Sequence, residues 1–397
     1  MTQDERSIEN ERKLHQALRV HAETLTPVAL TSSSVFQSFF IGGFECSTHR
    51  RRDGKRLDLI ASTQHDTYAR SDYLILAEHR IRTARDGLRW PLIETIPGVY
   101  DWSSFLPMLR AAKETGTQVI WDLCHWGWPD DIEIWSPAFV DRFAAFARAV
   151  AQVVRNETDQ VPFYVPVNEI SFWAWAGGDL ALINPLAIGR GNELKVILAR
   201  ATIAGIEAVR GVDPLARIAY AEPAIHVIPR SAERQDVQGA HHYTLAQFEA
   251  LDLISGRSRP ELGGRGDYID LVGVNYYLHN QWVDGDLPVG VDHPQYRLFR
   301  KLIADVYHRY KRLVFVAETG IEGDLRVPWL RMMSYEAAQA RHAGIPVEGL
   351  CLYPITDYPG WDDDRHCPTG LLGYVGADGR RPVDQGLAQE LRVLTGL

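Results

Sequence analysis

The chain has 397 residues, of which 46% are hydrophobic and 23% charged, as is usual for a globular protein with a sizeable core. Its 42 basic and 51 acidic side chains give a formal net charge of −9, which argues against nucleic acid or an anionic membrane surface as a partner. A polar N-terminus and the lack of a long apolar run predict neither a signal peptide nor a membrane span, so a cytoplasmic location is expected.

Residues 1–30 predict a polar helical extension, and residues 31–397 are expected to form one domain. An apolar strand is predicted at Phe39 and runs into the glycines 42 and 43. The basic stretch Arg50 to Arg56 follows it. Two interpretations of this stretch remain open: a solvated loop, or a binding site for an anionic group of a substrate.

After this stretch, helical and apolar segments alternate along the chain. Counting the strand at Phe39, eight strand candidates alternate with segments of helical periodicity, which predicts a parallel sheet. Eight such units over about 350 residues favour an α/β fold of the closed (β/α)8 TIM barrel type. The other seven predicted strands are Ile81 to Trp90, Gln118 to Leu123, Phe163 to Val167, Arg217 to Ala221, Leu271 to Tyr277, Leu313 to Ala317 and Val347 to Tyr353.

Two of these strands end in a glutamate. The run from Val161 to Val167 is apolar and breaks into Asn168-Glu169, and the run from Leu313 to Ala317 ends at Glu318. The two glutamates are far apart in sequence, but a closed barrel brings the carboxyl ends of all strands to one rim, where such barrels carry their chemistry. One glutamate at a strand end is often just solvated; two of them are a hypothesis about catalysis.

Polar and aromatic side chains gather after the other strands as well, and the chain contains 11 tryptophans. Aromatic faces at a barrel rim are typical of a sugar-binding cleft, although most tryptophans in any protein only pack. The residues at the predicted rim include Arg85, His125, Trp126, Asn168, Asn275, Tyr277 and Trp361.

Paired carboxylates in an aromatic pocket suit the cleavage of a glycosidic bond. One carboxyl must carry a proton to donate to the leaving oxygen, and the other must be ionised to attack the anomeric carbon. A nearby arginine keeps the second carboxyl anionic, while apolar surroundings raise the pKa of the first.

The sequence predicts no metal and no cofactor. His241-His242 lacks a supporting ligand motif, and no glycine-rich dinucleotide motif follows the first strand. The four cysteines form no CxxC pair, so free or buried thiols in a reducing compartment are expected; a disulfide or a metal pair remains the alternative. They are Cys46, Cys124, Cys351 and Cys367.

From Phe39 to Asp384 the constellation resembles the family 1 glycoside hydrolases, which are retaining β-glycosidases built on a (β/α)8 barrel. The resemblance implies that Glu169 is the acid/base, that Glu318 is the nucleophile, and that Asn168 contacts the sugar 2-hydroxyl. It also implies that Tyr277 bonds the nucleophile and that Trp361 is the sugar platform. The matching positions for the remaining substrate-binding residues are Arg85, His125, Trp126 and Asn275.

The chain departs from the family pattern at four places. Asn168-Glu169 is followed by Ile170 where the family has proline, and Glu318 is followed by Thr319 where the family has asparagine. The family's glutamine after strand one is missing from the stretch Gly43 to Ser47, and Gly360 stands where a glutamate precedes the last tryptophan. Both catalytic carboxylates remain, but the sugar hydroxyls must be recognised differently. The chain therefore resembles a divergent relative.

We therefore expect a retaining β-glycosidase that acts on a small carbohydrate substrate without nucleic acid or membrane partners. The sequence does not separate this from a transglycosylase that uses the same two glutamates, because the two differ in how an acceptor competes with water. A non-catalytic sugar-binding barrel is a further alternative. Whether the chain forms a homo-oligomer is left open.

Overall fold

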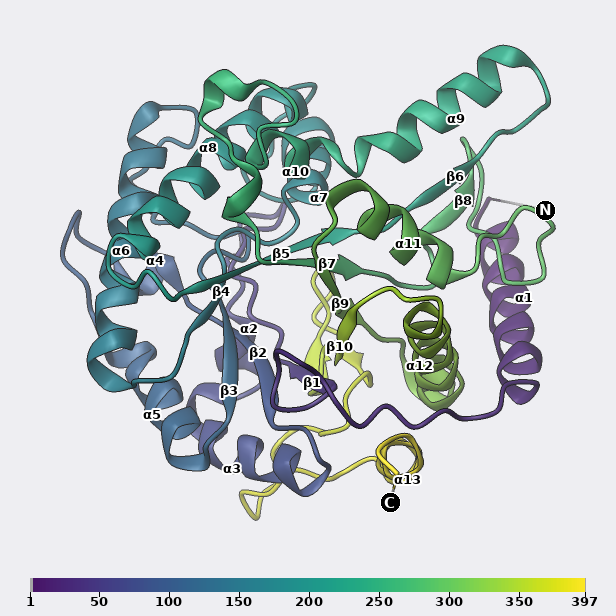
Figure 1. Ribbon diagram of the computed structural model, residues 1–397, viewed down its shortest axis with the longest axis horizontal. Coiled ribbons are helices and arrows are strands. Elements are labelled where there is room, and N and C mark those ends of the chain that lie inside the picture. The colour runs from purple at the N-terminus through teal and green to yellow at the C-terminus, as the bar shows by residue number, and fades with distance from the viewer. Residues whose placement is uncertain (1–2, 397) are drawn as a thin grey trace.

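The computed structural model describes residues 3–396, and within this range eight parallel strands close into a barrel (Figure 1). This confirms the predicted (β/α)8 barrel. Each predicted strand appears within a few residues of its expected position. The barrel strands are, in order around it, β1 (Phe40–Gly43), β2 (Thr83–Gly87), β3 (Gln118–Asp122), β4 (Phe163–Val165), β5 (Arg217–Pro223), β7 (Leu271–Asn275), β9 (Leu313–Thr319) and β10 (Val347–Leu352).

Helices surround the strands, as the alternating pattern predicts (Figure 1). The longer helices of the barrel are α3 (His65–Glu78), α5 (Leu106–Thr115), α6 (Pro137–Glu157), α8 (Gly191–Arg210), α9 (Arg234–Ala246), α11 (Phe299–Tyr310), α12 (Arg326–His342) and α13 (Gln385–Leu394). The shorter ones are α2 (Leu59–Ser62), α4 (Trp90–Ile93), α7 (Ile170–Trp173) with a π-helical turn at Ala174–Asp179, and α10 (Glu249–Ile254).

Several elements were not expected from the sequence. Two short parallel strands, β6 (His226–Ile228) and β8 (Gln281–Val283), pair outside the barrel, and β11 (Tyr358–Pro359) pairs with β12 (His366–Cys367) in a hairpin. These pieces are too short to leave a periodic pattern in the sequence. They extend the loops at the carboxyl ends of the barrel strands, where they shape the site described below.

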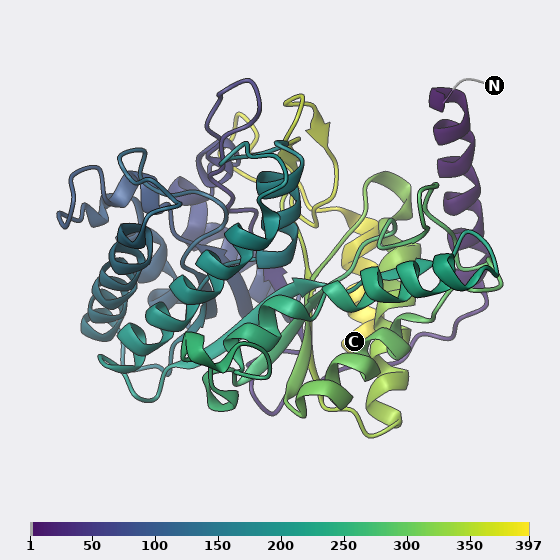
Figure 2. The ribbon, with the colours of Figure 1, turned by 90° about the horizontal axis from the view of Figure 1, so that it is seen from above.

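The N-terminal segment forms helix α1 (Gln3–Glu23), which lies at the edge of the molecule with α9 running toward it (Figure 2). Leu14 and Leu18 are buried, and α1 packs chiefly against α12. Residues 1 and 2 of the expected helical extension, and residue 397 of the expected barrel domain, lie outside the described residues. No helix within residues 3–396 is long and apolar enough to cross a membrane.

The core has two layers because alternate side chains of each strand point to opposite faces of the sheet. One layer lies between the strands and the surrounding helices. The other fills the barrel interior and includes small side chains such as Ala219 and Ala317. At the amino-terminal end, Phe36 packs against Phe163 and Phe315, each with ring centroids 5.5 Å apart, so aromatic side chains fill this end of the barrel.

All four cysteines are buried thiols, and no disulfide joins any of the described residues. The expectation of free, buried thiols is confirmed.

A buried ionic cluster ties the first helix of the barrel to its sheet. The His65 ring lies 2.8 Å from the carboxylates of both Asp72 and Asp86, and Tyr73 donates a hydrogen bond to Asp86. Arg381, near the C-terminal end of the chain, forms a bidentate ion pair with Asp72. Burial lowers the pKa of His65, but the two carboxylates outweigh it and raise that pKa to about 9.

This cluster predicts a stability that depends on pH. A histidine with a raised pKa stabilises the fold fully below its unfolded pKa of about 6.5 and loses that contribution as pH rises through 9. We expect the free energy of unfolding, measured with urea, to decrease as pH rises from 6.5 to 9. This decrease should be about 3 kcal/mol larger in the wild type than in His65→Gln. As a control, replacement of the exposed His342 by glutamine should leave this pH dependence as in the wild type. If the free energy of unfolding of the wild type and of His65→Gln changed with pH in parallel, His65 would not be the group responsible.

Candidate active site

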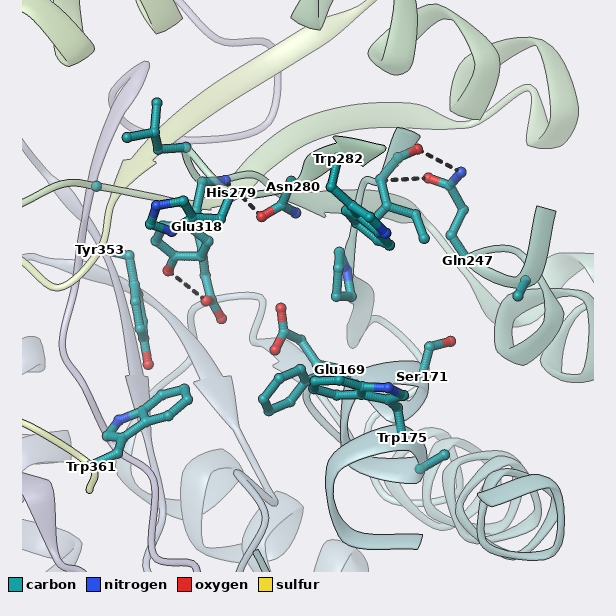
Figure 3. Close-up of a pocket in the computed structure, with 18 of the residues that line it drawn as sticks. Glu169, Ser171, Trp175, Gln247, His279, Asn280, Trp282, Glu318, Tyr353 and Trp361 are labelled. Atoms are coloured by element: carbon teal, nitrogen blue, oxygen red, sulfur yellow. Dashed lines mark hydrogen bonds between the residues drawn. The ribbon is translucent and has the colours of Figure 1, made fainter. Parts of the chain in front are cut away.

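A large pocket opens at the carboxyl ends of the barrel strands, with a cavity volume of about 1480 Å³ (Figure 3). Glu169 and Glu318 both line it, so the closed fold brings the two predicted glutamates into one site. Tyr277 and Trp361 line it as well. The other predicted site residues lie beneath its wall and are at most 2% exposed: Arg85, His125, Trp126, Asn168 and Asn275.

Glu318 sits at the end of β9 and is held at both carboxylate oxygens. Arg85 Nη1 donates a hydrogen bond to its Oε1 at 2.6 Å, and the Tyr277 hydroxyl donates to its Oε2 at 2.9 Å. The two partners come from opposite sides of the barrel, Arg85 from β2 and Tyr277 from the loop after β7. The two hydrogen bonds fix the orientation of the carboxylate at both of its oxygens.

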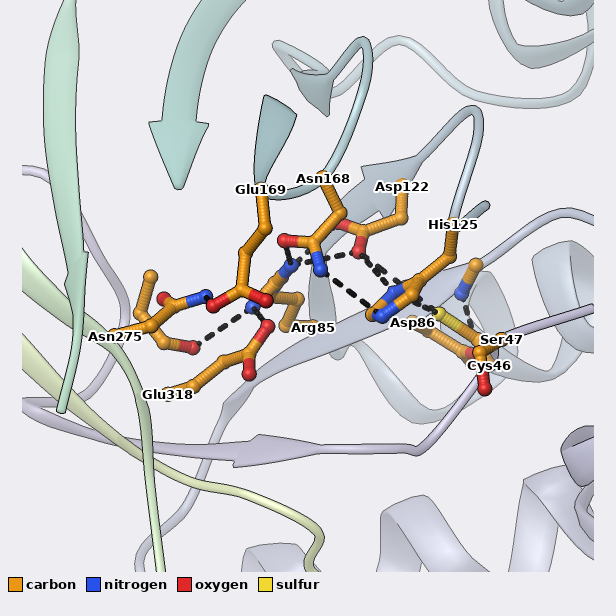
Figure 4. A network of polar contacts seen from close by, with 12 residues as sticks. Cys46, Ser47, Arg85, Asp86, Asp122, His125, Asn168, Glu169, Asn275 and Glu318 are labelled. Carbon is orange, nitrogen blue, oxygen red and sulfur yellow. Dashed lines mark hydrogen bonds and ion pairs between the residues drawn. The ribbon is translucent and has the colours of Figure 1, made fainter. Parts of the chain in front are cut away.

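Glu169 follows β4, and its carboxyl points toward that of Glu318 (Figure 4). The Asn275 amide donates a hydrogen bond to Glu169 Oε1 at 2.8 Å. Burial and the nearby charge of Glu318 together raise the pKa of Glu169 well above the usual range of a glutamate. The two carboxyls thus face each other in opposite environments.

The backbone at Glu169 is left-handed, with φ 45° and ψ 60°. For a residue with a side chain this conformation costs about 1 to 3 kcal/mol and persists only where the surroundings hold it. Here the Glu169 N–H donates to the Ala221 carbonyl at 3.0 Å, and the next turn begins with Trp173 N–H donating to the Glu169 carbonyl. The turn aims the side chain into the pocket.

Arg85 connects the two sides of the site. Besides Glu318, its guanidinium donates to both oxygens of Asp122, at 3.0 and 2.7 Å, and to Asn168 Oδ1 at 2.6 Å (Figure 4). The guanidinium is wholly buried, so these charge-assisted bonds are formed away from water. Arg85 thereby fixes Glu318 and the segment that carries Glu169 relative to the same strand.

The hydrogen bonds of Asn168 determine the tautomer of His125. Because Asn168 Oδ1 accepts from Arg85, its amide nitrogen is the atom that lies 2.9 Å from His125 Nε2. An amide nitrogen only donates, so Nε2 accepts, and the ring proton sits on Nδ1, 3.1 Å from Asp122. This neutral histidine thus supports Asn168 from behind.

Phe172, Trp175 and Trp361 line one side of the pocket, and Trp126 packs against Phe172 and Trp361 from beneath. The rings of Trp361 and Trp126 meet edge to face at 4.9 Å, and Phe172 lies against Trp126 at 5.0 Å and Trp175 at 5.8 Å. Trp175 is 41% exposed and lines the pocket. Its neighbour Trp173 is buried and donates its indole N–H to a backbone carbonyl, so only one of these two tryptophans faces the cavity.

The pocket continues outward along elements that the sequence did not predict to line a binding site. Trp175 and Trp282 lie on one side of Glu169, while Tyr353 and Trp361 lie on the other (Figure 3). Residues of α9 and α1 line its outer end, among them His242, Tyr243 and Glu11. His242 is exposed on helix α9.

Three residues near the site, two of them carboxyls, were not among the predicted site residues. Glu45, after β1, is buried and lines the pocket, and Tyr353, after β10, lines it as well. Both follow a barrel strand, which is the signal that identified Glu169 and Glu318. Glu222, at the end of β5, accepts from the Ser171 backbone N–H and the Tyr220 hydroxyl; burial raises its pKa to about 7. Its charge contributes to the raised pKa of Glu169.

The basic stretch after β1 is engaged in local contacts. Arg50 and Arg56 pair with Asp130, while Arg51 and Lys55 pair with Asp364. Arg52 donates to the carbonyls of residues 180 and 181. These cations tie loops of the rim together. This arrangement favours a structural role over binding of an anionic substrate group.

Cys46, Asp122 and His125 form the one group of side chains in residues 3–396 close enough to share a metal ion. Their chemistry does not suit one. Arg85 occupies both oxygens of Asp122, His125 carries its proton on the nitrogen that faces the group, and burial raises the pKa of the Cys46 thiol well above its usual value.

The fold of the chain is similar to that of solved β-glucosidases. A β-glucosidase from Thermotoga maritima in complex with glucoimidazole is 16% identical, with a TM-score of 0.75 over 92% of this chain and 99% of that chain. A family 1 β-glucosidase from Thermotoga maritima is 17% identical, with a TM-score of 0.70 over 84% of this chain and 88% of that chain. The AHE enzyme from Alicyclobacillus herbarius is 16% identical, with a TM-score of 0.74 over 94% of this chain and all of that chain. No family model and no curated protein sequence matches the chain.

Proposed function

We propose that the protein is a retaining β-glycosidase, a divergent relative of the family 1 glycoside hydrolases, with Glu318 as nucleophile and Glu169 as acid/base. The observation that carries this proposal is the pair of facing carboxyls in opposite environments. Arg85 and Tyr277 hold Glu318 at both oxygens, while burial and the charge of Glu318 raise the pKa of Glu169. Such a division between two carboxyls is what double displacement at a glycosidic bond requires.

In the first step, Glu318 attacks the anomeric carbon while Glu169 gives its proton to the leaving oxygen. The bond to the leaving group breaks, and the sugar becomes an ester of Glu318. Tyr277 and Arg85, already in place at the Glu318 carboxylate, orient the attacking oxygen. Once Glu318 is esterified, its charge no longer raises the pKa of Glu169, so Glu169 can remain ionised and accept the proton of the attacking water in the second step.

In the second step, Glu169 takes a proton from a water molecule that attacks the anomeric carbon, and the sugar is released with Glu318 as its leaving group. Two inversions give net retention. This mechanism predicts about 5 to 5.5 Å between the two carboxyl groups, because attack by a carboxylate leaves no room for an intervening water.

The shape of the pocket supports one orientation of the substrate. The side with Tyr353 is deep and lined by buried residues, whereas the side with Trp175 is open to solvent. A sugar ring on the deep side places its leaving group between Trp175 and Trp282. Flat apolar side chains at that position suit an aryl or other apolar leaving group.

The test is turnover of 4-nitrophenyl β- and α-glycosides by the wild type, with the anomer of the first product followed by proton NMR. We expect cleavage of one or more β-glycosides, no cleavage of the matching α-glycosides, and the β-anomer as the first product. Release of the α-anomer first would overturn the retaining mechanism. Binding of sugars without any turnover would favour a non-catalytic barrel.

A further inference from the structure

Glu45 is a buried carboxyl on the deep side of the pocket, and the proposed mechanism does not use it. It follows β1 and lines the cavity although it is only 2% exposed. The Ser47 backbone N–H donates to its Oε1 at 3.0 Å and fixes its orientation. No salt bridge reaches Glu45 from any part of residues 3–396, and burial raises its pKa. A buried carboxyl without a cation needs polar partners.

Tyr353 lines the same side of the pocket with an unsatisfied hydroxyl. This residue follows β10, is 2% exposed, and its hydroxyl has no hydrogen-bond partner within the part of the chain that the structure describes. Its ring packs over the Arg85 guanidinium at 5.3 Å. Burial and the charge of Glu45 raise the pKa of Tyr353 well above the usual range of a tyrosine.

The backbone of β1 makes room for this arrangement. Strands β1 and β10 are paired neighbours, and the Ile355 N–H donates to the Gly43 carbonyl at 2.7 Å. A Cβ atom at Gly43 would lie 2.2 Å from Cδ2 of the Tyr353 ring. Glycine at this position therefore allows the ring to lie against the strand, with its hydroxyl at the pocket.

We propose that Glu45 and Tyr353 bind hydroxyl groups of the sugar on the side away from the bond that is cleaved, and so determine which sugar the site accepts. This inference deepens the proposed function and rests on it. A carboxylate accepts from two adjacent hydroxyls, and a tyrosine hydroxyl both donates and accepts. Neither group has another partner that would compete with the sugar, apart from Ser47 at Glu45.

The same chemistry defines the class of sugar. No salt bridge within residues 3–396 pairs Glu45 with a cation, so a sugar carboxylate or phosphate placed on this side would lack a partner of opposite charge. The site should therefore take a neutral pyranose with adjacent free hydroxyls. A site built to bond a hydroxyl discriminates strongly against analogues without it, because its own polar groups are then left unpaired.

The experiment pairs two variants, Glu45→Gln and Tyr353→Phe, with deoxy analogues of the best 4-nitrophenyl substrate. We expect each variant to lower kcat/KM about 10- to 100-fold for the full sugar, the cost of one hydrogen bond to a buried or charged group. One deoxy analogue lacks the hydroxyl that the altered residue binds. For this analogue, kcat/KM should be nearly the same in the variant and in the wild type. A residue with only a structural role would weaken all analogues equally.

Two control variants match the changes. Tyr164→Phe removes another buried, unpartnered hydroxyl, in the core outside the barrel. Glu348→Gln alters another buried carboxyl that accepts a backbone N–H, from Ser34. Both controls should leave the preference among deoxy analogues unchanged.

The binding of free glucose, galactose, mannose and xylose, measured by calorimetry, separates this inference from the proposed function. If the wild type cleaves no glycoside but binds a sugar that both variants bind more weakly, the inference stands and the glycosidase proposal fails. Cleavage with equal losses for all deoxy analogues overturns the inference alone. Binding that neither variant weakens, or no binding by the wild type, overturns it as well.

Discussion

Replacement of Glu318 by alanine should lower kcat/KM for 4-nitrophenyl β-glycosides by about 10⁴-fold or more, as expected for the loss of an attacking group. The variant keeps Glu169 and the pocket, so substrate still binds but no ester can form. The side chain of Arg85 loses one of its carboxylate partners and keeps Asp122. Folding should therefore be retained, which circular dichroism and the unfolding temperature can check.

Added azide provides the decisive measurement on Glu318→Ala. The small anion can enter the space vacated by the carboxylate and attack the anomeric carbon from the face that Glu318 uses. The product is then an α-glycosyl azide, identified by proton NMR. The control variant Glu348→Gln, at the opposite end of the barrel, should behave as the wild type with or without azide. Full activity in Glu318→Ala would remove Glu318 from the role of nucleophile.

Replacement of Glu169 by alanine should produce a loss that depends on the leaving group. For an alkyl glycoside, whose leaving oxygen needs a proton, we expect kcat/KM to fall about 10²- to 10⁴-fold. For 2,4-dinitrophenyl glycosides, whose leaving group departs without a proton, kcat/KM should stay within about tenfold of the wild type. Equal losses for both substrates would show that Glu169 does not act as an acid.

The pH profile gives a second measure of the same role. Glu169 works as an acid while protonated, and burial and the charge of Glu318 raise its pKa. The wild type should therefore keep its kcat/KM up to a pH above the usual range of a glutamate and lose it as Glu169 gives up its proton. In Glu169→Ala this basic limb should be missing.

The glutamates at the ends of two apolar strands could be predicted as site residues from the sequence because the geometry of a closed parallel barrel is regular. Parallel strands in a closed sheet bring their carboxyl ends to one rim, so residues far apart in the chain become neighbours. The same rule pointed to Arg85, Asn168 and Tyr277. It also applied to Glu45 and Tyr353, whose part in the pocket became visible only from the burial of both residues and the unsatisfied hydroxyl of Tyr353.

Other features followed no local pattern. The ion pairs of Arg85 with Asp122 and Glu318 join three different strands, and the His65 cluster reaches Arg381 near the other end of the chain. Loop cations such as Arg51 find acids more than 300 residues away in the sequence. The position of a charged residue in the sequence does not indicate its partner. The composition of the basic stretch Arg50 to Arg56 therefore did not distinguish a loop that binds a substrate from a loop held by ion pairs.

Hydrophobic periodicity and strand ends predicted the barrel and the two glutamates at its rim, because these are local properties that the closed sheet converts into positions. Only the tertiary structure decided which polar residues face the cavity and which support it from behind. Arg85, His125, Asn168 and Asn275 are buried beneath the wall, whereas Glu45, Tyr353 and Trp282 line it. Burial and hydrogen-bond partners depend on contacts between segments distant in the chain; these contacts raise the pKa of Glu169 and leave the Tyr353 hydroxyl without a hydrogen-bond partner among residues 3–396.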